Sequence, residues 1–215
     1  MKPNAAINDL LTVMAKLRSP TGGCPWDLEQ DHMSLRFHAV EEVYELLDAI
    51  EAGDDHEMVE ELGDLLLQVV FHCQLAKERR AFDFDQVCRH ILDKLIRRHP
   101  HVFGEKNVHT AEAVLAQWEH IKRAEKKGTR HERPSALDGI PRHLPALLRA
   151  EKLLKKARKA GLMEVRKPGQ RPRSKTTLAK ELFALAEYAQ QKGWNAEDLL
   201  RSEIKKQERV LRRRE

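Results

Sequence analysis

Residues 38–72 read HAVEEVYELLDAIEAGDDHEMVEELGDLLLQVVFH and decide the fold. On both sides of Gly53, apolar residues recur every three or four positions, the spacing that places them on one face of an α-helix. Gly53 suits the left-handed residue that ends a helix, and Asp54 suits the cap that begins the next one. The stretch therefore predicts two helices, over residues 34–52 and 54–77, that pack antiparallel across a short turn.

Helical periodicity also runs through most of the rest of the 215-residue chain. Hydrophobic residues make up 41% of the sequence and charged residues 34%, whereas aromatic residues make up only 5%. Amphipathic helices suit this balance better than sheets, which use more aromatic residues and more glycine turns. The sequence therefore predicts an all-α fold. The other predicted helices cover residues 7–17, 85–98, 111–127, 144–160, 178–192 and 196–213.

Membrane-spanning, disulfide-rich and secreted proteins are all disfavoured by the sequence. It has no run of 18 apolar residues, which a membrane-spanning helix requires. Its three cysteines are odd in number and form no CxxC pair, so neither a disulfide scaffold nor a cysteine-rich zinc site is expected. The first 17 residues show no signal-peptide pattern. We therefore predict a cytoplasmic protein.

The net charge of +5 conceals an uneven distribution. Residues 1–120 carry a balance of −10, and residues 121–215 carry a balance of +15. A strongly basic half is typical of proteins that bind DNA or RNA, because neutralising phosphates releases counterions. A helical nucleic-acid-binding or partner-binding protein without catalysis is therefore the alternative function that the composition leaves open.

The acidic residues concentrate in one stretch of 24 residues. Eleven carboxylates and no lysine or arginine lie between residues 41 and 64. Like charges three or four positions apart destabilise a helix, so this density predicts a cation that offsets the repulsion. The spacings EExxE and ExxD place two groups of carboxylates where antiparallel helices can bring them face to face. The candidate catalytic and metal-ligating residues are Glu41, Glu42, Glu45, Glu61 and Asp64.

Mg²⁺ suits such clustered carboxylates, and Mn²⁺ is expected to substitute for it. The alternative is a solvated acidic surface, because each spacing alone is common in helical proteins. Three cationic residues, Lys94, Arg97 and Arg98, share one side of a predicted helix end. They either contact phosphates or stabilise the helix C-terminus. Trp118 is either a surface on which a nucleotide base stacks or a partly buried core residue.

Two late segments repeat the pattern of earlier ones. Residues 62–74 align with residues 178–190, and residues 85–97 align with residues 197–209 after a shorter connection. The identities are few, so the alternative is a pair of unrelated amphipathic helices that share leucine and alanine. The repeat predicts that the C-terminal helices share an origin with the helices around the acidic stretch.

Several motifs together resemble the MazG family of nucleoside triphosphate pyrophosphohydrolases. The strongest are CPWD at 24–27, HAVEEVYELLDAI at 38–50, ELGDLLLQVVFH at 61–72 and RRHPHVFG at 97–104. Two downstream segments, WEHIK at 118–122 and SALDGIP at 135–141, resemble the family as well. The resemblance covers residues 5–165 well and the remainder faintly.

The resemblance implies a four-helix-bundle-type all-α NTP pyrophosphatase, usually dimeric, that hydrolyses nucleoside triphosphates to monophosphates and pyrophosphate with Mg²⁺. By position, it implies that Glu42, Glu45, Glu61 and Asp64 are the metal ligands and that Glu41 supports them. It also implies that the nucleotide-binding residues are Lys94, Arg98 and the adjacent Arg97. A homodimer with a nucleoside triphosphate substrate is therefore expected.

The second half departs from the family pattern. The equivalents of Glu61 and Asp64 there are Thr177 and Lys180, which cannot replace carboxylates as Mg²⁺ ligands. We therefore expect one active site per chain and a C-terminal repeat that has lost its chemistry. The predicted parts are a pyrophosphohydrolase domain at 1–130, a basic helix and linker at 131–176, and a degenerate helical repeat at 177–215.

Overall fold

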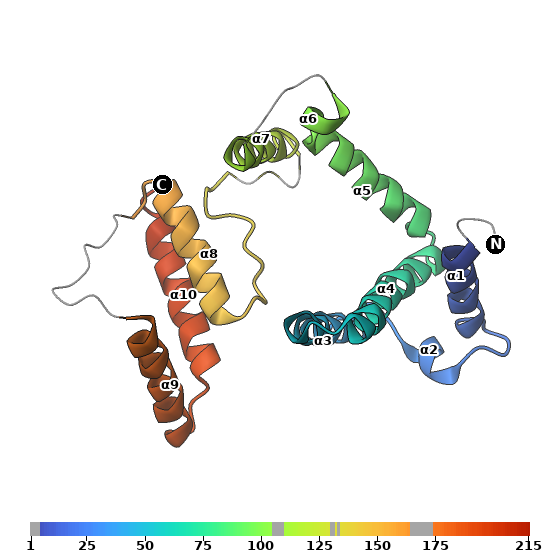
Figure 1. The fold of residues 1–215 in the computed structure, drawn as a ribbon, viewed down its shortest axis with the longest axis horizontal. Coiled ribbons are helices and arrows are strands. Elements are labelled where there is room, and N and C mark those ends of the chain that lie inside the picture. The colour runs from blue at the N-terminus through green and yellow to red at the C-terminus, as the bar shows by residue number, and fades with distance from the viewer. Residues whose placement is uncertain (1–4, 105–109, 130–131, 133, 164–173) are drawn as a thin grey trace. The chain divides into compact units, whose positions relative to one another are not determined.

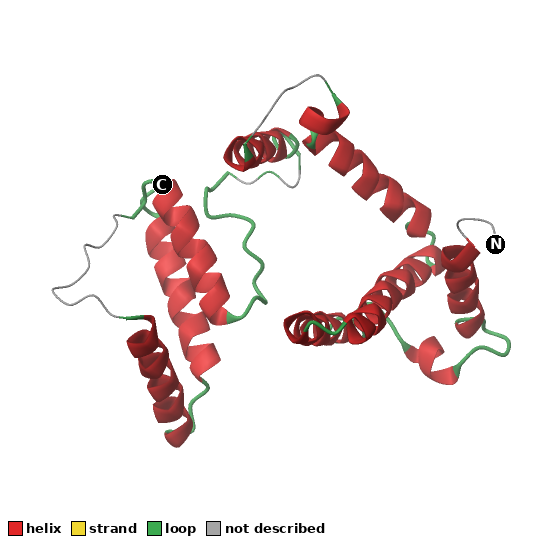
Figure 2. Cartoon of the chain, viewed as in Figure 1, coloured by secondary structure: helices red, strands yellow, loops and turns green. Residues whose placement is uncertain are grey.

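Helices account for all the regular structure in the described part of the chain. The computed structural model describes residues 5–104, 110–129, 132, 134–163 and 174–215. These ranges form ten helices and no strand, which confirms the all-α prediction (Figure 2). None of the described helices is both long enough and apolar enough to cross a bilayer.

The chain divides into two compact units, residues 1–109 and 110–215. The predicted domain boundaries at residues 130 and 176 stay predictions. Of the basic helix and linker predicted at 131–176, residues 131, 133 and 164–173 lie outside the described residues.

The first unit contains six helices, drawn in blue to green in Figure 1. They are α1 (Ala5–Leu17), α2 (Pro25–Glu29), α3 (His38–Ala52), α4 (Asp55–Glu78), α5 (Phe84–Arg98) and α6 (Pro100–Phe103). The most extensive packing in the unit joins α3 to α4, and α1 also packs on α4. α3 begins four residues later than the spacing predicts. The Asp31 carboxylate accepts hydrogen bonds from the N–H groups of Met33 and Ser34, which holds this segment in a turn.

The turn between α3 and α4 confirms the roles predicted for Gly53 and Asp54. Gly53 has a φ of 68°, a left-handed conformation that L side chains rarely adopt, and its N–H bonds to the last turn of α3. The Asp54 carboxylate accepts hydrogen bonds from the N–H groups of His56 and Glu57, at 2.9 and 3.2 Å. These local contacts explain why α4 starts directly after α3 ends.

The core of the first unit lies along the C-terminal half of α4. Val70 and Phe71 of α4 pack with Met14 of α1 and with Leu35 of the loop before α3. The run at 62–71 is apolar nearly all round, which predicts that its helix is the most buried one, and α4 does have the most buried residues among the described helices. Within the run itself, however, the exposed residues are Leu62, Gly63, Leu66 and Val69.

The apolar face predicted for α3 does not pack on α4. Ala49 of α3 is buried, and Glu42 and Leu46 on the same face are half-buried. The more apolar face is 41–51% exposed within the single chain. Its residues are Val40, Val43, Tyr44, Leu47 and Ile50. α3 is therefore rotated about its axis so that the face with Glu42, Leu46 and Ala49 lies toward α4.

The second unit contains four helices. They are α7 (Ala111–Ala124), α8 (Ala146–Lys159), α9 (Lys175–Gln191) and α10 (Ala196–Arg212). α8 and α10 pack side by side, as Figure 1 shows, with Leu153 and Ala157 of α8 buried against Ile204 and Leu211 of α10. A nearly buried ion pair between Arg149 and Glu208, 2.6 Å long, joins the same two helices.

Candidate active site

Three of the predicted carboxylates converge between α3 and α4. Ligand oxygens of Glu42, Glu45 and Glu61 all lie within 4.8 Å of one another. Glu42 and Glu45 are one turn apart on α3, and Glu61 is two turns into α4. The antiparallel pairing across Gly53 therefore brings together residues from both predicted acidic spacings. Below, these three residues are called the carboxylate cluster.

Electrostatic interactions connect Asp64 and Glu41 to the carboxylate cluster. Loss of hydration, followed by the nearby charge of Glu42 and then that of Glu41, raises the pKa of Glu45. Loss of hydration, then the charges of Glu45 and Asp64, raises the pKa of Glu61. Asp64 acts on both residues, so it belongs to the same electrostatic site.

Glu41 is exposed at the edge of this site. Its carboxylate lies 3.6 Å from Nδ1 of His38, one turn earlier on α3. It also contributes to the raised pKa of Glu45. Glu41 is therefore placed beside the carboxylate cluster and not within it, which agrees with the supporting role that the resemblance implies.

The donor set fits a hard divalent cation. Mg²⁺ binds oxygen at about 2.0–2.1 Å, so two of its ligand oxygens lie at most about 4.2 Å apart. The 4.8 Å limit within the carboxylate cluster is only slightly larger, and a small side-chain movement would close it. A bound cation would also offset the like-charge repulsion that adds to loss of hydration in raising the pKa values of Glu45 and Glu61.

The predicted phosphate-binding residues lie on α5. Lys94 is half-buried, Arg97 is exposed and Arg98 is only 7% exposed. Figure 1 shows α5 leaving the C-terminal end of α4 and diverging from the α3–α4 pair. The end of α5 that carries these cations therefore lies away from the carboxylate cluster of the same chain, and their contact with phosphates stays a prediction.

Comparison with known proteins identifies this unit. Residues 30–103 match the MazG nucleotide pyrophosphohydrolase domain. That range includes the whole carboxylate cluster, Asp64 and the three cations of α5. This part of the chain is a MazG nucleotide pyrophosphohydrolase domain. The expected resemblance to the MazG family is therefore confirmed.

Named relatives support the same assignment. The nucleoside triphosphate pyrophosphohydrolase of Escherichia coli K12 is 49% identical over 155 residues, which are 72% of this chain and 58% of that protein. A nucleoside triphosphate pyrophosphohydrolase/pyrophosphatase MazG of Thermotoga maritima is 46% identical over 153 residues, 71% of this chain and 57% of that protein. The chain thus spans somewhat more than half the length of these curated relatives.

The prediction from sequence missed one polar residue of the MazG domain, Gln68. Its side chain is 7% exposed, and Nε2 donates a hydrogen bond to Oε1 of Glu42 at 3.1 Å. Gln68 follows Asp64 by four positions and Glu61 by seven, so all three share one face of α4. A polar residue at that spacing inside an apolar run is the signal that could have found it.

A histidine pair next to the core was also missed. Nδ1 of His32 and Nδ1 of His72 are 2.8 Å apart, and the rings stack with centroids separated by 5.1 Å. Burial, and then the nearby His32, lower the pKa of His72. The pair connects the loop before α3 to the helix that carries Glu61 and Asp64.

This lowered pKa predicts that the MazG domain loses stability in weak acid. The unfolded chain protonates His72 near pH 6.5, whereas the folded chain does so only at lower pH. As pH falls below about 6.5, the unfolded state therefore binds more protons and the free energy of unfolding falls. His72→Gln should flatten this pH dependence, measured by urea unfolding at pH 7.5 and 5.5. His90→Gln, at an exposed position of α5, is the control, and an unchanged slope in His72→Gln would contradict the prediction.

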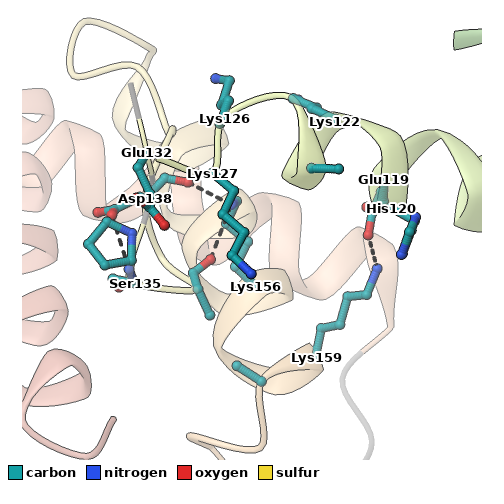
Figure 3. Close-up of a pocket in the computed structure, with 14 residues that line it drawn as sticks. Glu119, His120, Lys122, Lys126, Lys127, Glu132, Ser135, Asp138, Lys156 and Lys159 are labelled. Atoms are coloured by element: carbon teal, nitrogen blue, oxygen red, sulfur yellow. Dashed lines mark hydrogen bonds and ion pairs between the residues drawn. The ribbon is translucent and has the colours of Figure 1, made fainter. Parts of the chain in front are cut away.

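Trp118 and a large cavity lie in the second unit, outside the MazG domain. Nζ of Lys122 sits 5.1 Å from the centre of the Trp118 ring. The neighbouring cavity, of about 770 Å³, is lined by α7, the loop after it and α8 (Figure 3). Lys156 donates to the carbonyl oxygen of Asp138 at 2.7 Å, and Lys159 pairs with Glu119. These lysines therefore join the loop and helices of the unit, and the predicted base-stacking role of Trp118 stays a prediction.

Proposed function

We propose that this chain hydrolyses nucleoside triphosphates to nucleoside monophosphates and pyrophosphate in a Mg²⁺-dependent reaction, with Mn²⁺ as a substitute. The observation that carries the proposal is the carboxylate cluster, contributed by two packed helices inside a MazG domain. The relatives from Escherichia coli and Thermotoga maritima are nucleoside triphosphate pyrophosphohydrolases, which supports the same reaction class. The role in the cell would be clean-up or control of the nucleotide pool.

The carboxylates would have two different roles at this site, metal binding and proton transfer. Glu42, Glu45, Glu61 and Asp64 would hold the metal, which when bound screens phosphate charge and acidifies a coordinated water. Whichever of Glu41 and Glu45 does not ligate the metal would accept a proton from the attacking water.

The cations of α5 would bind the substrate phosphates. Lys94 and Arg98, with Arg97 adjacent, would stabilise charge that develops on the pyrophosphate leaving group. Because α5 diverges from the α3–α4 pair, these cations would act either after a rearrangement or toward the carboxylate cluster of a second copy.

A homodimer is the assembly that the exposed apolar surface supports. The outward face of α3, the part of α4 up to Val69, and α5 all expose large apolar side chains, which water-soluble monomers rarely gather in one unit. Besides the α3 residues named above, they are Val59, Leu62, Leu66, Val69, Ile91, Leu92, Leu95 and Ile96. Packing of these helices against a second copy would bury them and complete the four-helix-bundle-type arrangement.

The C-terminal helices would form a degenerate repeat without a second metal site. Thr177 and Lys180, in the first half of α9, occupy the positions equivalent to Glu61 and Asp64. An ammonium group would repel a divalent cation there. The apolar residues of α9 that the repeat preserves are themselves exposed, including Leu182 and Phe183, so their packing partner is not within the described chain.

Metal binding provides the direct test of the proposal. Mg²⁺ at a hundredfold excess over its Kd should stabilise the native state by about 2.7 kcal/mol. This corresponds to a rise in Tm of about 5–10 °C for a chain of this size. Calorimetric titration with a non-hydrolysable nucleotide and Mg²⁺ should give one site per chain, and pyrophosphate release should require the metal.

Glu57→Gln is the control for this experiment. Glu57 belongs to a second group, with His56 and Glu60, whose candidate ligand atoms also lie within 4.8 Å of one another, but all three of these residues are exposed, near the start of α4 and outside the carboxylate cluster. The variant should retain the Mg²⁺-dependent shift. A melting curve that Mg²⁺ leaves unmoved, with and without nucleotide, would overturn the metal assignment, and two nucleotide sites per chain would overturn the degenerate repeat.

A further inference from the structure

We infer that Gln68 is a positioning residue that orients Glu42 as a metal ligand and binds a water molecule of the metal's hydration shell. The inference rests on the function proposed above, because it assigns a role at the same carboxylate cluster. Gln68 differs from the other residues of the site in being uncharged and nearly buried, with 7% of its surface exposed.

The hydrogen bond to Glu42 defines how the amide is turned. A carboxylate oxygen can only accept at neutral pH, so the group that faces Oε1 of Glu42 at 3.1 Å must be the NH₂ of Gln68. With Oε1 engaged, the second oxygen of Glu42 remains available to the carboxylate cluster. Gln68 is itself held in place by burial, since only 7% of its surface is exposed. The hydrogen bond from the rigidly held Gln68 side chain on α4 therefore favours one rotamer of Glu42.

The carbonyl oxygen of the Gln68 amide indicates that a ligand binds here. Oε1 of Gln68 is fully shielded from solvent and, among the described residues, has no hydrogen-bond partner. Buried polar atoms without partners are rare, because the loss of hydration is not compensated. A carbonyl oxygen accepts hydrogen bonds, and a water bound to a divalent cation is a strong donor. Oε1 of Gln68 therefore suits a coordinated water better than it suits the anionic phosphates of a nucleotide.

The position of Gln68 along α4 supports the same assignment. Glu61, Asp64 and Gln68 follow one another at spacings of three and four, so they form one stripe on the face toward α3. Groups that hydrogen-bond to metal ligands commonly set metal affinity, and losing them costs about 10–100-fold. The neutral amide of Gln68, which can both donate and accept a hydrogen bond, thus lies one helical turn after Asp64, the last predicted ligand.

The test substitutes Gln68→Met, which keeps the length of the side chain but removes both hydrogen-bonding groups. The Kd for Mn²⁺, measured on the metal-free full chain by electron paramagnetic resonance, should rise about 10–100-fold. Saturating Mn²⁺ should restore kcat, which general structural damage would not allow. Gln74→Met is the matched control, because Gln74 on the same helix donates to Glu78 at 3.0 Å, away from the carboxylate cluster.

A second pair of measurements separates the possible outcomes. In a Glu42→Gln background, Gln68→Met should raise the Kd for Mn²⁺ by less than it does in the wild-type chain, because only the contact with the coordinated water is left to lose. In the wild-type chain, the side-chain amide NMR signals of Gln68 should shift on Mg²⁺ addition, while those of Gln74 should not. This second measurement does not depend on whether the variant folds.

Each result counts for or against one of the two proposals. Wild-type Mn²⁺ affinity in Gln68→Met, or unmoved Gln68 amide signals at saturating Mg²⁺, would overturn the role of Gln68 alone. Full metal affinity and turnover in Glu42→Gln would overturn the proposed metal site itself.

Discussion

Glu42→Gln and Asp64→Asn should each lower turnover by about a thousandfold or more. Metal stabilisation of a phosphoryl transition state contributes several kcal/mol, and each 1.36 kcal/mol changes the rate about tenfold. Glu42 lies in the carboxylate cluster, and the charge of Asp64 acts on Glu45 and Glu61. Steady-state pyrophosphate release over a range of Mg²⁺ concentrations measures the effect.

The same variants should fold at least as well as the wild type without metal. Removing one negative charge lowers the pKa values of Glu45 and Glu61 toward their ordinary range, because less like charge surrounds them. For carboxyls with raised pKa values, the folded state binds more protons than the unfolded state as pH rises above about 4.5. Stability is therefore lost over that window. Replacing Glu42 or Asp64 by a neutral amide should therefore restore part of this lost stability at pH 7.

Melting curves of the metal-free variants check this second expectation. Glu57→Gln, which removes a carboxylate on α4 outside the carboxylate cluster, is the matched control for both turnover and stability. Near-normal turnover in either variant would exclude that residue from the site. A large drop in the Tm of the metal-free Glu42→Gln chain would instead indicate that Glu42 has a structural role.

Leu47→Glu should convert the proposed homodimer into monomers. Leu47 is near the middle of the outward face of α3 and is 46% exposed in the single chain. A carboxylate there would lose its hydration in an apolar interface, next to an identical charge from the partner if the contact is two-fold symmetric. Hot-spot residues near the centre of an interface cost about 2 kcal/mol or more when they are replaced, and a buried charge at Leu47 should cost at least as much, so we expect the dimer Kd to rise about 30-fold or more.

Analytical ultracentrifugation over a range of concentrations measures this change. Val13→Glu is the control, because Val13 on α1 is similarly exposed, at 52%, but lies outside the α3, α4 and α5 surface. If the α5 cations of one copy serve the carboxylate cluster of the other, Leu47→Glu should also lose activity in step with dissociation. A wild-type chain that sediments as a monomer at all concentrations would refute the proposed dimer.

Local signals account for the part of the structure that could be predicted. Gly53 and Asp54 mark the end of α3 and the start of α4 through contacts within five residues of each position. The two acidic spacings needed only this short turn to bring Glu42, Glu45 and Glu61 together. Secondary structure and the carboxylate cluster follow from sequence because each depends on residues close in the chain.

Only the tertiary structure shows which face of each helix packs against its neighbours. The hydrophobic pattern of α3 predicts that Val43 and Leu47 are buried, yet α3 turns Glu42 and Ala49 toward α4 and leaves the apolar face exposed. The course of α5, and so the place of Lys94 and Arg98, likewise depends on contacts distant in sequence.

Gln68 illustrates the same limit within the site. Composition and spacing show only that a polar residue interrupts an apolar run, and they do not say whether it faces solvent or another helix. Its hydrogen bond to Glu42 joins positions 26 residues apart and exists only because of the rotation of α3 about its own axis. By itself, the sequence determined the helices and the grouping of their carboxylates, because both depend on short-range backbone geometry. The burial of Gln68 and the exposure of Leu47 were decided by the tertiary structure, because helix rotation is a balance of packing across the whole pair.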